Sequence, residues 1–322
     1  MVDVTAPVIG ERERERERGR GGESGEETAP PPTTTIPTHP HPARSPTAGT
    51  PPPDALITVD AIRAVEATLD AGPSLTALRR FSDALAALPA ATARARLRPV
   101  MHALAHNLES FNPAFCAVLL AVQMTIGETD YCRRDAALAR LIQPLAGEYG
   151  MHNGAPQAAT HRALFQAFYE DLLREPLAHA LAADAAPALS VALFEKMMAD
   201  IQGAGAATAL GRDATTPTER ASYALGYNLA IEYLADYEKT WMLDAFRALN
   251  DRVLAPAGTP LTQWTFLEVH AEGEAEHAAL GHAAVADVVP AAHAHLLAAA
   301  AADHDADFAV FYGALADMLE EA

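Results

Sequence analysis

The chain has 322 residues, of which 50% are hydrophobic, and its formal net charge is −19. This apolar content suffices for a sizeable core and excludes a protein that is disordered over most of its length. The negative charge would repel phosphate groups, which argues against nucleic acids and anionic membrane surfaces as partners.

The cysteines and the apolar runs bear on the cellular compartment. Cys116 and Cys132 are the two cysteines of the sequence, too few for a disulfide framework or a thiolate zinc site. The N-terminus has no apolar stretch of signal-peptide type. The longest apolar run, residues 114–126, is shorter than the roughly 20 residues that cross a membrane. We therefore expect a soluble, cytoplasmic protein.

Residues 1–54 differ in composition from the rest of the chain. They hold 11 of the 23 prolines and an alternating Glu-Arg run over residues 11–18. Such a segment buries too little apolar surface to offset the entropy lost on ordering. The sequence predicts a disordered tail over 1–54, followed by one folded domain over 55–322. The Glu-Arg run could be an interaction tail, although a solvated leader is the simpler interpretation.

From residue 55 onward, the sequence is rich in Ala and Leu and is interrupted by Pro or Gly at helix-length intervals, a pattern typical of an all-α protein. Helix starts are indicated by Thr216-Pro217 with Glu219 in the first turn and by Asn112-Pro113. Unequal helices with short connections favour one bundle. The expected helices, the last two of them divided, span residues 59–71, 74–88, 90–108, 113–126, 130–149, 156–182, 186–202, 217–249, 261–289 and 291–320.

The densest group of potential metal ligands is His270, Glu274 and His277. On a helix, their spacing places them within about 60° of one another around the axis. Two imidazoles and a carboxylate on one stripe could bind a metal ion. The alternative is a polar outer face, because other Glu and His residues are scattered nearby.

Two further segments could add ligands. Glu148 precedes a glycine stop at Gly150, and we expect His161 one turn inside the next helix, so an antiparallel hairpin can bring both toward the interior. His161 could instead be an ordinary packed side chain. Glu232 lies among apolar residues and could point inward, where a cation would neutralise it, but Glu238 in the same helix is a competitor.

Together, these segments resemble the iron-containing redox enzymes of the haem-oxygenase-like diiron oxidase superfamily. The similarity extends over roughly residues 140 to 285. Glu274 stands where the family pattern usually has Asp, the loop from Glu148 to His161 is longer than usual, and residues 250–261 are extra. The matching text is Glu148-Tyr-Gly followed by His161, then Gly226-Tyr-Asn-Leu-Ala-Ile-Glu232, then His270-Ala-Glu-Gly-Glu274-Ala-Glu-His277.

The resemblance implies a haem-oxygenase-like helical bundle that holds two Fe(II) ions and uses O2 as co-substrate. Glu232 is preferred to Glu238 because its lead-in from Gly226 matches the family. The expected reaction is N-oxygenation, desaturation or C–C cleavage of an amine, amino acid or fatty acid, and the chain could form a homodimer. The metal ligands that the resemblance implies are Glu148, His161, Glu232, His270, Glu274 and His277.

Two other classes of function stay open. One is a metal-free relative of the thiamin-salvage or quinone-cofactor type, in which the same helical architecture binds a small molecule. The other is a non-enzymatic all-α interaction protein, in which the six residues are ordinary polar groups. Haem oxygenation is less expected, because the His residues form a shared set and do not provide a single proximal ligand.

Overall fold

The computed structural model describes residues 55–321 except 153–154, 157 and 183–185, and it leaves out the side chains of residues 152, 156, 239 and 270–277. The expected disordered tail, residues 1–54, lies outside the described residues. All the residues described belong to one compact unit.

Helices account for nearly all the secondary structure of the described residues, which confirms the all-α prediction. A two-residue antiparallel hairpin, β1 (Met151–His152) and β2 (Ala155–Pro156), lies between two of the helices. Single turns of other helix types occur at Asp200–Ala204, Asn250–Leu254 and Ala291–His293. The α-helices are α1 (Val59–Leu69), α2 (Pro73–Ala87), α3 (Ala93–Gln123), α4 (Tyr131–Glu148), α5 (His161–Leu173), α6 (Leu177–Ala180), α7 (Ala188–Ala199), α8 (Gly205–Leu210), α9 (Pro217–Leu249), α10 (Thr265–Val288) and α11 (Ala294–Glu320).

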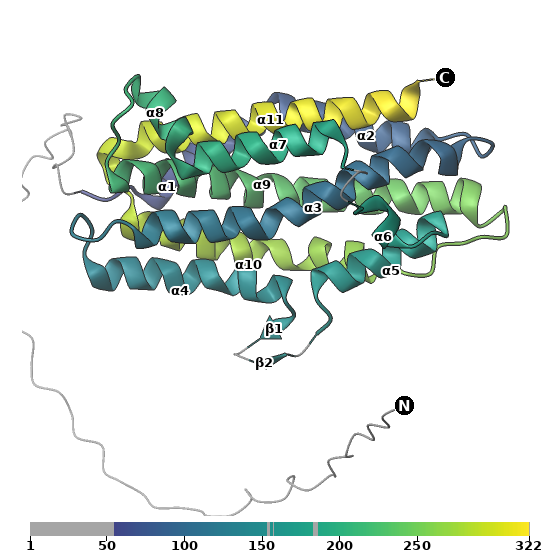
Figure 1. Ribbon diagram of the computed structural model, residues 1–322, viewed down its shortest axis with the longest axis horizontal. Coiled ribbons are helices and arrows are strands. Elements are labelled where there is room, and N and C mark those ends of the chain that lie inside the picture. The colour runs from purple at the N-terminus through teal and green to yellow at the C-terminus, as the bar shows by residue number, and fades with distance from the viewer. Residues whose placement is uncertain (1–54, 153–154, 157, 183–185, 322) are drawn as a thin grey trace, which may run out of the picture. The chain divides into compact units, whose positions relative to one another are not determined.

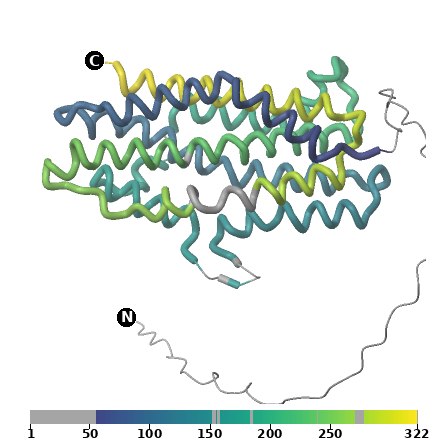
Figure 2. Tube along the Cα trace, turned by 180° about the vertical axis from the view of Figure 1, so that it is seen from behind, coloured from purple at the N-terminus to yellow at the C-terminus, as the bar shows by residue number. Residues whose placement is uncertain are grey.

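The long helices run side by side as a bundle (Figure 1). Helix α9 lies inside it and packs against α2, α3, α10 and α11. Helices α4, α5 and α10 form the lower part of the bundle in Figure 1, with the β1–β2 hairpin below them. Seen from behind, α2 lies along α11 (Figure 2). Of the helices that carry the other candidate residues, α10 packs directly against α9, and α4 and α5 pack against α10.

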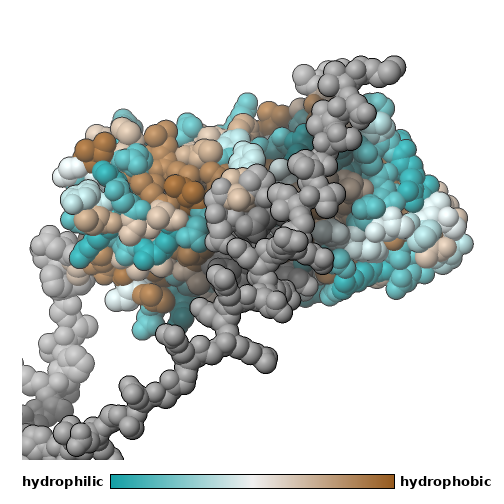
Figure 3. All heavy atoms as spheres, turned by 90° about the horizontal axis from the view of Figure 1, so that it is seen from below, coloured by the Kyte–Doolittle hydropathy of each residue, from teal (hydrophilic) through white to brown (hydrophobic). Residues whose placement is uncertain are grey.

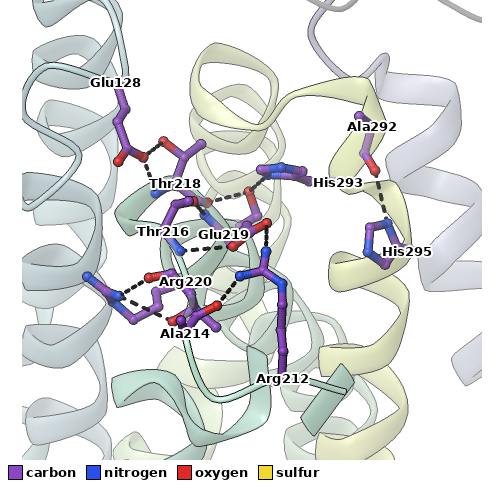
Figure 4. Close-up of polar contacts among 12 residues, drawn as sticks. Glu128, Arg212, Ala214, Thr216, Thr218, Glu219, Arg220, Ala292, His293 and His295 are labelled. Atoms are coloured by element: carbon purple, nitrogen blue, oxygen red, sulfur yellow. Dashed lines mark hydrogen bonds and ion pairs between the residues drawn. The ribbon is translucent and has the colours of Figure 1, made fainter. Parts of the chain in front are cut away.

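Helix α9 begins at the start signal that the sequence predicts. Thr216 Oγ1 accepts a hydrogen bond from the backbone N–H of Glu219, and the Glu219 carboxylate accepts one from the Thr216 backbone N–H (Figure 4). The Glu128 carboxylate accepts two further bonds from Thr218, one from its backbone N–H and one from its hydroxyl. These bonds satisfy N–H groups that the first turn of a helix leaves without helical partners.

A glycine allows α9 and α11 to approach closely. A Cβ atom at Gly226 would lie 2.7 Å from Leu297 Cα and 2.8 Å from the Leu297 carbonyl oxygen. Backbone atoms cannot move aside as a flexible side chain can, so this contact requires a residue without a side chain. Gly226 therefore fixes the spacing between the two helices.

The buried apolar side chains form two clusters, and α9 contributes to both. One cluster contains Phe81, Phe168 and Phe246, and the other contains Ile62 and Tyr223. All five of these side chains are fully buried. Aromatic residues that bury this much surface contribute strongly to stability, so the bundle has the sizeable core that the composition predicts.

The outer surface mixes hydrophilic and hydrophobic side chains. In the view of Figure 3, a brown apolar area lies toward the end of the bundle that holds the α3–α4 turn. At that turn, Leu120, Met124, Ile126 and Tyr131 are all exposed. None of the described helices is both long enough and apolar enough to span a membrane.

Three expectations about helix boundaries are wrong. A break near Asn112-Pro113 is absent, because α3 continues through Pro113 with its later residues buried, and packing outweighs the one hydrogen bond that proline removes. The expected helix 156–182 is interrupted after Leu173, where Arg174 has a φ of 60° and Pro176 follows. Helices α10 and α11 are undivided, because a bundle tolerates isolated glycines within a helix.

Candidate metal centre

The connection between α4 and α5 positions the first two candidate residues. Helix α4 ends at Glu148, and Gly150 follows with a φ of 68°. A Cβ atom there would collide with the Ala158 carbonyl oxygen, so the turn needs glycine. Thr160 then caps α5 by accepting a hydrogen bond of 3.1 Å from the Ala163 backbone N–H. His161 is thus the first residue of α5, and the expectation that it lies one turn inside the helix is wrong.

Glu148 and His161 are in direct contact across this connection. Glu148 Oε1 lies 2.8 Å from His161 Nδ1, and each side chain is 22% exposed. The carboxylate accepts a hydrogen bond when Nδ1 carries the proton. The expected antiparallel hairpin is wrong, because α4 and α5 follow one another end to end along the bundle (Figure 1) and both pack against α10. The junction between the end of α4 and the start of α5 therefore brings together two groups of the kind that bind transition metals.

These two side chains open onto a cavity of about 500 Å³ that Glu232 also lines. Glu232 comes from the middle of α9 and is 7% exposed, so the cavity receives polar groups from three different helices. The other walls come from α3 and α10. The lining residues are Leu108, Glu109, Phe111, Asn112, Pro113, Phe115, Pro144, Glu148, Tyr149, Thr160, His161, Arg162, Phe165, Ile231, Glu232, Ala235 and Phe266.

The described lining of the cavity is acidic. It contains the carboxylates of Glu109, Glu148 and Glu232 and the guanidinium of Arg162, which forms an ion pair with Glu109. With His161 neutral, these groups sum to a charge of −2. Carboxylates inside a partly apolar cavity interact strongly with a cation, so the lining favours a positively charged occupant.

Glu238 occupies a different part of the bundle. It is 3% exposed, and burial, together with the charge of Glu238, raises the pKa of Tyr312, on α11, well above the ordinary value of a phenol. Positions six residues apart on a helix differ by about 120° around its axis, so Glu232 and Glu238 face different neighbours. Of the two rivals, Glu232 lines the cavity and Glu238 faces Tyr312.

The third group of candidates lies in the middle of α10. The side chains of His270, Glu274 and His277 are outside the described residues, although the backbone there is helical. Helix α10 packs against α4, α5 and α9, and Phe266, near its start, lines the cavity. Among the side chains that are described, no group of three His, Cys, Asp or Glu residues is arranged to hold a metal ion.

Sequence reasoning missed several lining residues on α3. It placed a break between residues 108 and 113, which assigned Glu109 and Phe111 to a loop and hid their helical spacing from Phe115. In a continuous helix, Glu109 and Asn112 stand three positions apart and share a face, and both line the cavity. Arg162 could have been noticed as a cation next to His161.

Other histidines make contacts away from the cavity. His282, on α10, has Nε2 2.5 Å from Oε1 of the buried Glu66 on α1. His293 Nδ1 lies 3.0 Å from Ser222 Oγ, beside the capped start of α9 (Figure 4). Burial lowers the pKa of His293, which favours its neutral form. These two histidines therefore connect helices through polar contacts.

Comparisons with known proteins add little to this description. No protein-family model matches the chain, and no curated protein matches it. Its fold is similar to the crystal structure of a CADD-like protein of unknown function from Nostoc punctiforme, with a TM-score of 0.46 and 17% sequence identity over 75% of this chain and 96% of that chain. No functional assignment follows from so distant a likeness.

Proposed function

We propose that the chain is a non-haem diiron oxidase or oxygenase of the cytoplasm, which uses O2 to oxidise a small organic molecule. The observation that carries the proposal is the acidic cavity in which the Glu148–His161 pair and Glu232 meet from three helices. Carboxylates and imidazoles together are the donor set that iron enzymes use when they activate O2.

The proposed ligand set is completed by α10. The helical repeat puts positions 270, 274 and 277 on the face of α10 that carries Phe266, and Phe266 lines the cavity. His270, Glu274 and His277 would then join the three residues from α4, α5 and α9. Of the two acidic residues considered in α9, Glu232 is the proposed ligand because it lines this cavity.

Charge balance supports two metal ions. Glu148, Glu232 and Glu274 contribute −3, and the three histidines are neutral when they bind a metal. Two Fe(II) ions contribute +4, which leaves +1 for groups derived from oxygen or substrate. When bound, the ferrous ions would supply the electrons that reduce O2.

The other residues of the cavity define what it can accept. The side chains of Leu108, Phe165 and Phe266 make part of the wall apolar, and the Glu109–Arg162 ion pair lies on the same lining. A volume of about 500 Å³ is within the range of pockets for small molecules. An amine, an amino acid or a fatty acid would fit this size, and N-oxygenation, desaturation or C–C cleavage are the reactions we consider.

Two matched variants test the proposal. Glu232→Gln and Glu238→Gln each replace one buried carboxylate in α9 with an amide of nearly equal size. We expect Glu232→Gln to weaken Fe(II) binding by about 10–100-fold and to reduce O2 consumption by the iron-loaded protein. Glu238→Gln should bind iron like the wild type, because its side chain faces Tyr312.

Circular dichroism and urea unfolding of both variants provide the control for folding. The reverse pattern, with iron binding lost in Glu238→Gln alone, would make Glu238 the ligand. Equal iron binding in both variants would contradict the role of Glu232. A folded wild-type chain that binds no iron would favour the alternative function, in which the same helical architecture binds a small molecule without a metal.

A further inference from the structure

A second, smaller hollow lies beside the candidate metal cavity. We call it the inner chamber. It is formed by α3, α7, α9 and α11, and its free space is about 10 Å³. That space is close to what one water-sized group needs. Phe111, Phe115 and Ile231 line both the cavity and the inner chamber, so the two hollows adjoin at these three side chains.

His304 provides the unusual polar group of the inner chamber. It comes from α11 and is 1% exposed. Its ring lies 4.9 Å from that of Tyr227 and 4.5 Å from that of Phe308, measured between centroids. Neither ring nitrogen has a hydrogen-bond partner among the described residues. A buried imidazole in this state lacks the hydrogen bonds that water would provide, which is costly.

The imidazole of His304 is neutral under ordinary conditions. Burial, together with the positive charge of Lys196, lowers the pKa of His304 to about 3. A neutral imidazole offers one N–H donor and one nitrogen acceptor. The missing partner is therefore a group that can accept or donate a hydrogen bond without carrying a charge.

The walls of the inner chamber favour the same kind of group. Its described lining consists of apolar, amide, hydroxyl and phenol side chains besides His304, with no carboxylate and no ammonium or guanidinium group. A charged group would lose its hydration there without gaining an opposite charge. The acidic main cavity differs from the inner chamber in this respect, since its described lining carries a net charge of −2.

We propose that the inner chamber is a binding subsite for the uncharged hydroxyl end of a small ligand, whose apolar body lies in the main cavity against Phe111, Phe115 and Ile231. His304 is the residue that hydrogen-bonds this hydroxyl. The inference rests on the proposed function in one respect, namely that the main cavity binds the substrate. Binding at the subsite itself requires no iron. The substrate class is thereby narrowed to molecules with an alcohol at one end.

The experiment uses the full chain without metal, with its histidines labelled with 15N, and 1-pentanol as the probe. We expect 1-pentanol to shift the ring 15N signals of His304 in a saturable manner. His106 provides an internal control, because its Nε2 already lies 2.8 Å from the Ala180 carbonyl oxygen. Pentylammonium and pentanoate, which have the same carbon chain with a charged end, should bind at least about tenfold more weakly at His304.

The variant His304→Phe should bind 1-pentanol about tenfold more weakly, since one hydrogen bond is lost. If this variant does not fold, the proposal is still tested by comparing how 1-pentanol, pentylammonium and pentanoate bind to the wild type. Unchanged His304 signals at saturating 1-pentanol, which is the result expected if water alone occupies the inner chamber, would overturn the proposal. Equal responses of His304 to 1-pentanol and to the charged probes would also overturn it.

These outcomes are separate from those that test the iron site. If the chain binds iron but the His304 signals do not change with 1-pentanol, the proposed function stands and the subsite proposal is wrong. A chain that binds no iron while His304 responds to 1-pentanol retains the subsite and loses the diiron proposal.

Discussion

Replacing His304 with phenylalanine should reduce the sensitivity of the fold to acid. In the folded chain the pKa of His304 is lowered from 6.5 to about 3, chiefly by burial and also by the charge of Lys196 on α7. The unfolded chain therefore binds a proton that the folded chain does not bind between these two values. The free energy of unfolding then rises with pH across this window and falls as acid is added.

The size of the effect follows from the shift. Each pKa unit corresponds to 1.36 kcal/mol, so His304 accounts for at most about 5 kcal/mol over the whole window and about 3 kcal/mol between pH 6.5 and pH 4.5. Phenylalanine has a similar ring, can pack against Tyr227 and Phe308, and binds no proton. It also removes two buried nitrogens without hydrogen bonds, so we expect equal or greater stability at pH 7.

The assay is urea unfolding of the wild type and His304→Phe at pH 7.0 and pH 4.5, followed by circular dichroism. The wild type should lose about 3 kcal/mol more than the variant on acidification. His295→Phe is the matched control, because it makes the same replacement at an exposed position of the same helix. Equal losses in the wild type and in His304→Phe would refute the reasoning.

Two other predictions concern packing and the tail. Gly226→Ala should lower the free energy of unfolding, measured in urea, by about 1–3 kcal/mol, because the added Cβ would meet the backbone of Leu297. Gly313→Ala is the control and should be neutral or stabilising, because the space around Gly313 is open. A chain that starts at residue 55 should unfold at the same urea concentration and bind as much iron as the full chain, since residues 1–54 have little apolar content; loss of iron binding on truncation would show that they belong to the site.

The fold was predictable wherever local signals and packing agree. The start of α9 has a threonine cap, a proline at the first position and a glutamate in the first turn, and the helix covers the predicted range Pro217–Leu249. Pro113 is the opposite case. A proline preceded by asparagine usually marks a helix start, but the buried residues that follow it hold α3 together as one helix. Single-sequence patterns do not contain this tertiary contribution.

The site was predictable in part for the same reason. The spacing of Glu148 and His161 around a glycine turn suggested that they approach each other, and they lie 2.8 Å apart. The choice between Glu232 and Glu238 depended on which neighbour each side chain faces, since both are buried and both lie in α9. That information comes from the packing of α9 against other helices. Glu109 was missed because its helix was expected to end before it.

The most direct test of the diiron proposal is the iron stoichiometry of the full chain, purified without chelators and loaded with Fe(II) in the absence of O2. The proposal predicts about two iron ions per chain after removal of unbound metal, with clear losses in Glu148→Gln and Glu232→Gln, because both carboxylates line the cavity. A folded wild-type chain that retains no iron, or one whose iron content is unaffected by both substitutions, would contradict it.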